Sequence, residues 1–135
     1  ALVDCIITPH PLEAARLLRR DQVDPDRLTV ACQLQSEYGA VVVLKGAATL
    51  VASDTGIAIN VLGGPAMATA GMGDVLSGLL GALLAQGQSL SRAAELGVAH
   101  HGRAAQMATA QQGEVGLLAR DVVRHVGRSL SGMTL

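Results

Sequence analysis

The chain has 135 residues, half of them apolar, and a formal net charge of −1. This length fits one domain, and the near-zero charge with few Lys and Arg argues against a nucleic-acid-binding surface. Tyr38 is the only aromatic residue, so the chain lacks the stacking platforms of single-strand binders, and Ala, Val, Leu, Ile and Met must build its core.

No apolar run reaches the roughly 18 residues that a membrane span needs, so no membrane partner is expected. Cys5 and Cys32 are too few and too isolated for a disulfide framework or a metal site. Both lie in apolar segments, which predicts buried, reduced thiols in a cytoplasmic protein.

The first third of the chain predicts a strand followed by two helices. An apolar run over residues 2–7 indicates a buried strand. Pro11 suits the first turn of a helix whose apolar face includes Leu17. Asp24-Pro25 resembles an N-cap followed by a proline at the first helical position, and this second helix should end at Gly39.

The middle of the chain predicts three more strands. Val41–Leu44 is continuous and mostly β-branched, as in a strand that is buried on both faces. Residues 49–52 and 57–60 flank Asp54-Thr-Gly56, which is a hairpin signal, and residues 63–65 indicate a loop. The remaining segments should be helices, over residues 73–86 (very apolar, hence deeply packed), 91–111 and 119–130.

Strands and helices alternate first and a run of helices follows, so we expect an α/β fold in which helices cover a sheet. Three or four strands are few for this much helix. We therefore expect residues 1–135 to be part of a larger domain, with further strands of the sheet outside this chain.

A glycine turn at the start of the helix over residues 73–86 is the most informative motif. Gly71 and Gly73 lack Cβ atoms, so the backbone can approach a ligand closely, and the N–H groups of a helix N-terminus attract anions such as phosphates. Asp74 stands where a carboxylate could accept a proton from a hydroxyl that attacks phosphorus. The alternative is that Asp74 simply caps the helix.

Two further motifs could hold an anion or a substrate. Lys45-Gly-Ala-Ala-Thr49 follows the buried strand and offers charge, backbone N–H groups and a hydroxyl to phosphate oxygens. The alternative is an ordinary turn with a Lys that reaches into solvent. Thr8-Pro-His-Pro-Leu-Glu13 presents His10 and Glu13 at a helix start, or is simply a proline-stiffened cap.

His100 and His101 are adjacent in a predicted helix, so their side chains point about 100° apart. No acidic or Cys partner follows one turn later. This pattern favours core or surface histidines over a metal site.

The three motifs occur together and in a recognisable order. With Leu84-Ala-Gln-Gly87 and the late segment Gly116–Asp121, they closely resemble the ADP/ATP-dependent NAD(P)H-hydrate dehydratase family, the C-terminal, ribokinase-like domain of YjeF-type proteins. The resemblance covers nearly the whole chain and about the C-terminal half of the family domain.

The resemblance implies removal of water from the S epimer of NAD(P)HX, a damaged nicotinamide cofactor, with consumption of ADP or ATP and with Mg²⁺. It implies that Asp74 is catalytic and faces the hydroxyl of the hydrate, and that His10 contacts the same substrate. The residues implied to bind the nucleotide are Lys45, Gly46, Ala47, Ala48, Thr49 and Gly73. The family also suggests a homo-oligomer.

Two other functions remain open. A kinase of the same fold, acting on a pyrimidine alcohol, would use the same Asp and glycine turn because both reactions begin with phosphoryl transfer. A half-domain that only binds nucleotide, or needs a partner chain, is the non-enzymatic alternative. Ala70 stands where the family commonly has Gly, and its methyl group restricts φ beside the predicted anion site.

Overall fold

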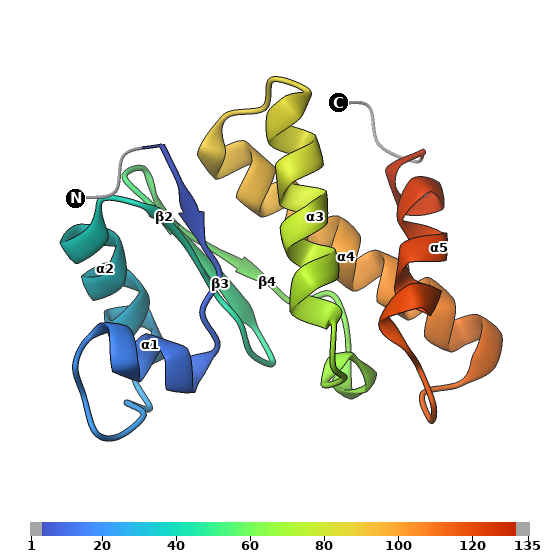
Figure 1. The fold of residues 1–135 in the computed structure, drawn as a ribbon, viewed down its shortest axis with the longest axis horizontal. Helices are drawn as coiled ribbons and strands as arrows, with labels where there is room; N and C mark the ends of the chain where they lie inside the picture. The colour runs from blue at the N-terminus through green and yellow to red at the C-terminus, as the bar shows by residue number, and fades with distance from the viewer. Residues whose placement is uncertain (1–3, 132–135) are drawn as a thin grey trace.

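The computed structural model describes residues 4–131 and shows a four-stranded mixed sheet between layers of helices (Figure 1). The strands are β1 (Ile6–Ile7), β2 (Val41–Leu44), β3 (Thr49–Ser53) and β4 (Gly56–Asn60), in this order across the sheet. β1 and β2 are parallel, whereas the other two pairings are antiparallel. The predicted α/β class is confirmed.

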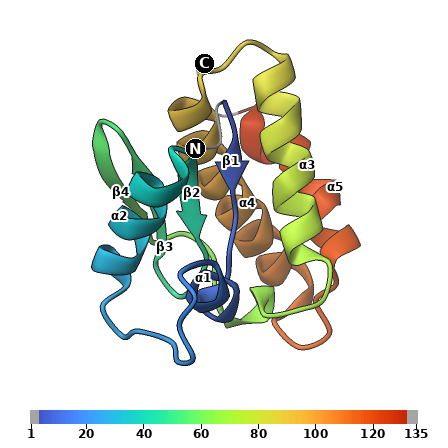
Figure 2. The same cartoon turned by 60° about the vertical axis from the view of Figure 1, so that its left-hand side comes forward.

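The helices are α1 (Pro11–Leu17), α2 (Arg27–Tyr38), α3 (Met72–Ala85), α4 (Leu90–Gln112) and α5 (Ala119–Leu130), with a short 3-10 helix η1 (Pro65–Met67) before α3. α1 and α2 cover one face of the sheet, α3 and α4 cover the other, and α5 lies outermost against α4 (Figures 1 and 2). No helix in this described part of the chain is both long enough and apolar enough to cross a membrane.

Successive side chains of β2 point to opposite faces of the sheet and thereby divide the core into two halves. Val42 and Leu44 pack against α1 and α2, whereas Val41 and Val43 pack against α3 and α4. All four side chains are buried, as expected for a strand with both faces covered. This strand, the hairpin of β3 and β4, and the boundaries of α3, α4 and α5 agree with the prediction to within a residue. The predicted loop at residues 63–65 runs directly into η1.

β1 is shorter and less buried than predicted. Of the predicted run over residues 2–7, only Ile6–Ile7 form the strand, and residues 2 and 3 lie outside the described part of the chain. Both isoleucines are half-buried, because among residues 4–131 only β2 pairs with this strand.

Asp26, not the predicted Asp24, caps α2. The Asp26 carboxylate accepts hydrogen bonds from the backbone N–H and the hydroxyl of Thr29, at 3.1 and 2.6 Å. Asp24 instead accepts the N–H of Asp26 at 2.9 Å, in the turn before the helix. α2 ends as predicted at Gly39, which is left-handed with φ 62°. The prediction of buried thiols is wrong for Cys32, which lies on the exposed side of this helix.

α3 packs through one face only, so the prediction of a deeply packed helix is wrong. On its inner face it lies very close to α4, since a Cβ atom at Gly97 would be 2.4 Å from Cδ2 of Leu80. On its outer face, Cβ atoms at Gly78 and Gly81 would meet no described atom within 4 Å. The apolar composition overstated the burial of α3, because small residues occupy its open side.

Candidate functional site

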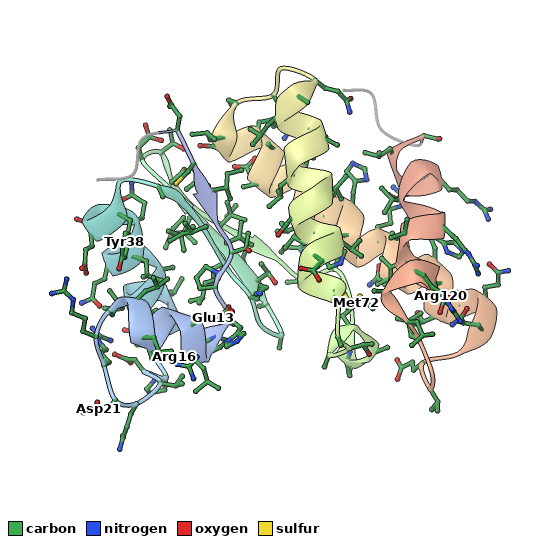
Figure 3. All side chains as sticks on the ribbon, in the orientation of Figure 1. Glu13, Arg16, Asp21, Tyr38, Met72 and Arg120 are labelled. Atoms are coloured by element: carbon green, nitrogen blue, oxygen red, sulfur yellow. The ribbon has the colours of Figure 1, made fainter. Side chains whose placement is uncertain are left out.

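The three motifs meet at one end of the sheet, where β2 ends and α1 and α3 begin. Figure 3 shows Glu13 near the start of α1 and Met72 at the start of α3 at this same end of the molecule. The ammonium of Lys45, directly after β2, lies between them. Its Nζ is 3.7 Å from Oε2 of Glu13 and 3.4 Å from the position that a Cβ atom would take at Gly73.

His10 and Glu13 form a reciprocal cap at the start of α1. Nδ1 of His10 accepts the backbone N–H of Glu13 at 3.2 Å, and Oε2 of Glu13 accepts the N–H of His10 at 2.7 Å. The hydrogen bond from the His10 backbone lowers the pKa of Glu13, and the Lys45 ammonium adds to this effect against partial burial. Glu13 is therefore a charged carboxylate between His10 and Lys45.

Hydrogen bonds of both backbone and side-chain groups hold the loop from Lys45 to Thr49 in place. The N–H of Lys45 donates to the carbonyl oxygen of Pro9 at 2.9 Å, which joins the loop to the segment before α1. The Thr49 hydroxyl donates to the carbonyl oxygen of Gly46 at 3.3 Å and so closes the loop. The Lys45 side chain is thus fixed at its base and turned toward the glycine turn.

The glycine turn leaves the start of α3 without a side-chain cap. Gly71 is the N-cap residue with φ 86°, a left-handed conformation that favours Gly. Asp74 is exposed, and its carboxylate has no hydrogen bond or ion pair among the described residues, so it does not cap the helix. Ala70 is not among the residues with positive φ, so its methyl group does not strain the turn.

A cavity of about 530 Å³ opens beside Lys45 and the glycine turn. Five of the predicted site residues contribute to its wall: Lys45, Gly46, Ala47, Thr49 and Gly73. Ala48, Asp74 and His10 are outside this wall, although Asp74 follows Gly73 directly and His10 reaches Lys45 through Glu13. Residues that the motifs did not reveal complete the wall, among them Asn60, Leu62, Val98 and His101.

His101 lines this cavity together with Asn60 and with apolar residues such as Leu62 and Val98. The residue is only 6% exposed, and its Nε2 is buried without a hydrogen-bond partner within the described residues. Burial lowers the pKa of His101 to about 4, so the ring is neutral near pH 7. His100 is fully buried on another side of α4, with Nδ1 3.3 Å from the Ser129 hydroxyl.

The arrangement suits a phosphorylated ligand better than a metal held by the protein alone. An uncapped helix start and a lysine ammonium both attract phosphate oxygens. In the described part of the chain, no three His, Cys, Asp or Glu side chains gather as ligands of one ion. The site thus combines an anion-binding surface with a free carboxylate, Asp74, at its edge.

Comparisons with known proteins show the family to which this chain is similar. A family model described as NAD(P)H-hydrate dehydratase matches residues 3–128. The bifunctional NAD(P)H-hydrate repair enzyme Nnr of Vibrio cholerae is 52% identical over 128 residues, which are 93% of this chain and 26% of that protein. The ADP-dependent (S)-NAD(P)H-hydrate dehydratase of Neisseria meningitidis is 49% identical over 121 residues, 87% of this chain and 41% of that protein.

Solved structures give the same result for the fold. The ADP/ATP-dependent NAD(P)H-hydrate dehydratase from Bacillus subtilis, co-crystallized with ATP/Mg²⁺, has a TM-score of 0.86 at 28% identity. A ribokinase-like superfamily protein from Enterococcus faecalis has a TM-score of 0.76 at 26% identity, which confirms the predicted ribokinase-like fold. The chain spans 47% and 44% of these two structures, about half of each.

Proposed function

The chain belongs to the NAD(P)H-hydrate dehydratase family, and from this we propose that it carries the nucleotide-binding and reacting part of a domain that dehydrates the S epimer of NAD(P)HX. The observation that carries the proposal is the position of the Lys45 ammonium between Glu13 and Gly73. The names of the relatives supply the reaction, because one is an ADP-dependent (S)-NAD(P)H-hydrate dehydratase.

We propose that ADP or ATP binds along the cavity with its phosphates at the Lys45 end. The residues assigned to the nucleotide are Lys45, Gly46, Ala47, Ala48, Thr49 and Gly73. The backbone N–H groups at the start of α3 would bind phosphate oxygens, since no side chain caps them. The nucleoside would lie toward Val98 and His101, where the His101 ring has a buried nitrogen without a partner among the described residues.

The residues present fit a Mg²⁺ ion that arrives with the nucleotide. Mg²⁺ is commonly held by one or two carboxylates together with substrate phosphates and water, so a protein cage is not required. Glu13 is the charged carboxylate beside Lys45 and would hold the ion. The ion would neutralise part of the negative charge on the phosphates.

We propose that Asp74 is the general base of the reaction. It accepts the proton of the hydrate's hydroxyl as that oxygen attacks the terminal phosphorus of the nucleotide. The new phosphate ester then leaves as inorganic phosphate with its C–O bonding electrons, expelled by the lone pair of the ring nitrogen. Loss of a proton from the adjacent ring carbon to water forms the C=C bond and restores NAD(P)H. His10 contacts the hydrate, and the amides from Gly71 to Gly73 stabilise the charge on the phosphoryl group in transit.

The direct test is dehydration of NADHX, measured as the return of NADH absorbance, with ADP or ATP and Mg²⁺ and with the purified chain combined with the preceding half of a relative's domain. Asp74→Asn should remove this activity, whereas Asp54→Asn, in the exposed turn between β3 and β4, should retain it. An unchanged Asp74→Asn enzyme would contradict the assigned base. Phosphorylation of a pyrimidine alcohol without dehydration of NADHX would instead establish the kinase alternative.

We also propose that residues 1–135 act as the C-terminal portion of a larger domain. The half-buried strand β1 and the open glycine face of α3 support this assignment. The chain also spans only 26% of the Vibrio cholerae relative and 47% of the Bacillus subtilis structure. Activity that appears only after addition of the preceding half of such a relative would support the assignment, and full activity of this chain alone would contradict it.

A further inference from the structure

The guanidinium of Arg27 lies directly behind the Lys45 loop. Arg27 is the first residue of α2, and its Nη2 donates hydrogen bonds to the carbonyl oxygens of Leu44 and Lys45, at 3.2 and 3.3 Å. These carbonyl groups belong to the last residue of β2 and the first residue of the loop. The start of one helix thus holds the peptide that carries the lysine of the site.

The backbone of Gly46 lies directly against this guanidinium. A Cβ atom at Gly46 would be 2.5 Å from Nη2 of Arg27 and 2.8 Å from Cζ. The guanidinium therefore occupies the space that a side chain at position 46 would need. A side chain at position 46 would therefore displace the guanidinium from its present place against the loop backbone.

No carboxylate lies within ion-pair distance of the Arg27 guanidinium in the described part of the chain. Arg27 takes part in none of the ion pairs among residues 4–131, and its Nε is buried without a hydrogen-bond partner there. Lys45 is paired with one carboxylate, Glu13, so the loop and its support carry an excess of positive charge. A phosphorylated ligand would compensate this charge.

We propose that Arg27 is a positioning residue for the Lys45 loop. It fixes the peptide from Leu44 to Gly46 so that the Lys45 ammonium reaches the glycine turn, and it adds positive potential from behind without touching the ligand. The inference rests on the proposed nucleotide site, because the phosphates are the groups that this loop would bind.

The test compares Arg27→Met and Arg27→Lys with a matched control, Arg20→Gln. Arg20 makes hydrogen bonds to Asp24 and Gln33 but none to the carbonyl groups of Leu44 and Lys45. Affinities for ADP and for adenosine are measured by calorimetry. We expect Arg27→Met to weaken ADP binding about tenfold with adenosine binding unchanged, and Arg27→Lys to recover part of the loss because the charge returns without the planar donor.

Hydrogen exchange of the ligand-free protein separates this inference from the nucleotide assignment. In Arg27→Met, amide exchange over residues 45–48 should accelerate about tenfold relative to the rest of the sheet, and Arg20→Gln should leave it unchanged. Unchanged exchange at these amides, or equal losses for ADP and adenosine, would overturn the role of Arg27. If the wild-type chain binds no ADP but Arg27→Met still shows the predicted faster exchange, the nucleotide site is overturned and the positioning role of Arg27 is retained.

Discussion

The free energy of unfolding should decrease less in weak acid for His101→Leu than for the wild type. The pKa of His101 is lowered from 6.5 to about 4 by burial, so protonation favours the unfolded chain. Protonation of His101 therefore leaves the free energy of unfolding unchanged above about pH 6.5 and lowers it as the pH decreases below this value. Below about pH 4, His101 causes no further decrease. At about 1.4 kcal/mol per pKa unit, the lowered pKa of His101 corresponds to about 3 kcal/mol of the free energy of unfolding. About 2 kcal/mol of this is lost between about pH 7 and pH 5.

Urea denaturation of the wild type and of His101→Leu between about pH 7 and pH 5 measures this difference. The range is chosen because the pKa values of Glu13, Asp26 and Asp121 are lowered, so these carboxylates lose their contribution only at lower pH. His100 is present in both proteins and its effect cancels. Parallel profiles of the two proteins would refute the argument, since His101 would then titrate equally in the folded and unfolded states.

Three further predictions concern packing and chemistry. Gly97→Ala should lower the free energy of unfolding by about 1–3 kcal/mol in urea denaturation, because its Cβ would meet Leu80 at 2.4 Å. Gly78→Ala, on the open side of α3, should be neutral or stabilising. Equal effects of the two variants would contradict the close contact of α3 with α4. Asp74→Asn should reduce kcat of dehydration by about 10²–10⁴-fold with ADP affinity retained in calorimetry, and a parallel loss of affinity would argue against a base. Lys45→Met should weaken ADP binding about tenfold or more by calorimetry, and undiminished affinity would place the phosphates elsewhere.

The central strand and the hairpin were predictable because their signals are local. The β-branched run Val41–Leu44 and the turn Asp54-Thr-Gly56 specify their own conformations. The cap of α2 was ambiguous because acidic residues flank Pro25 on both sides, and only the hydrogen bond to Thr29 shows that Asp26 is used. Composition also could not show which apolar residues of α3 face outward.

The site was predictable as motifs but not as a cavity. Lys45 and Gly73 were identified because each motif has a chemical signature in a short stretch of sequence. Their proximity, and the ion pair of Lys45 with Glu13, depend on how three elements meet. His101 carries no local signal, because its place in the cavity depends on contact between α4 and the segment after β4.

The cap of α1 also determines which tautomer His10 adopts. Because Nδ1 accepts the backbone N–H of Glu13, the neutral ring must carry its proton on Nε2. If the hydrate binds His10 as proposed, the imidazole would act toward it as a hydrogen-bond donor, because its other nitrogen is occupied in the helix cap. The proposed division between His10 as donor and Asp74 as base would therefore follow from a backbone hydrogen bond.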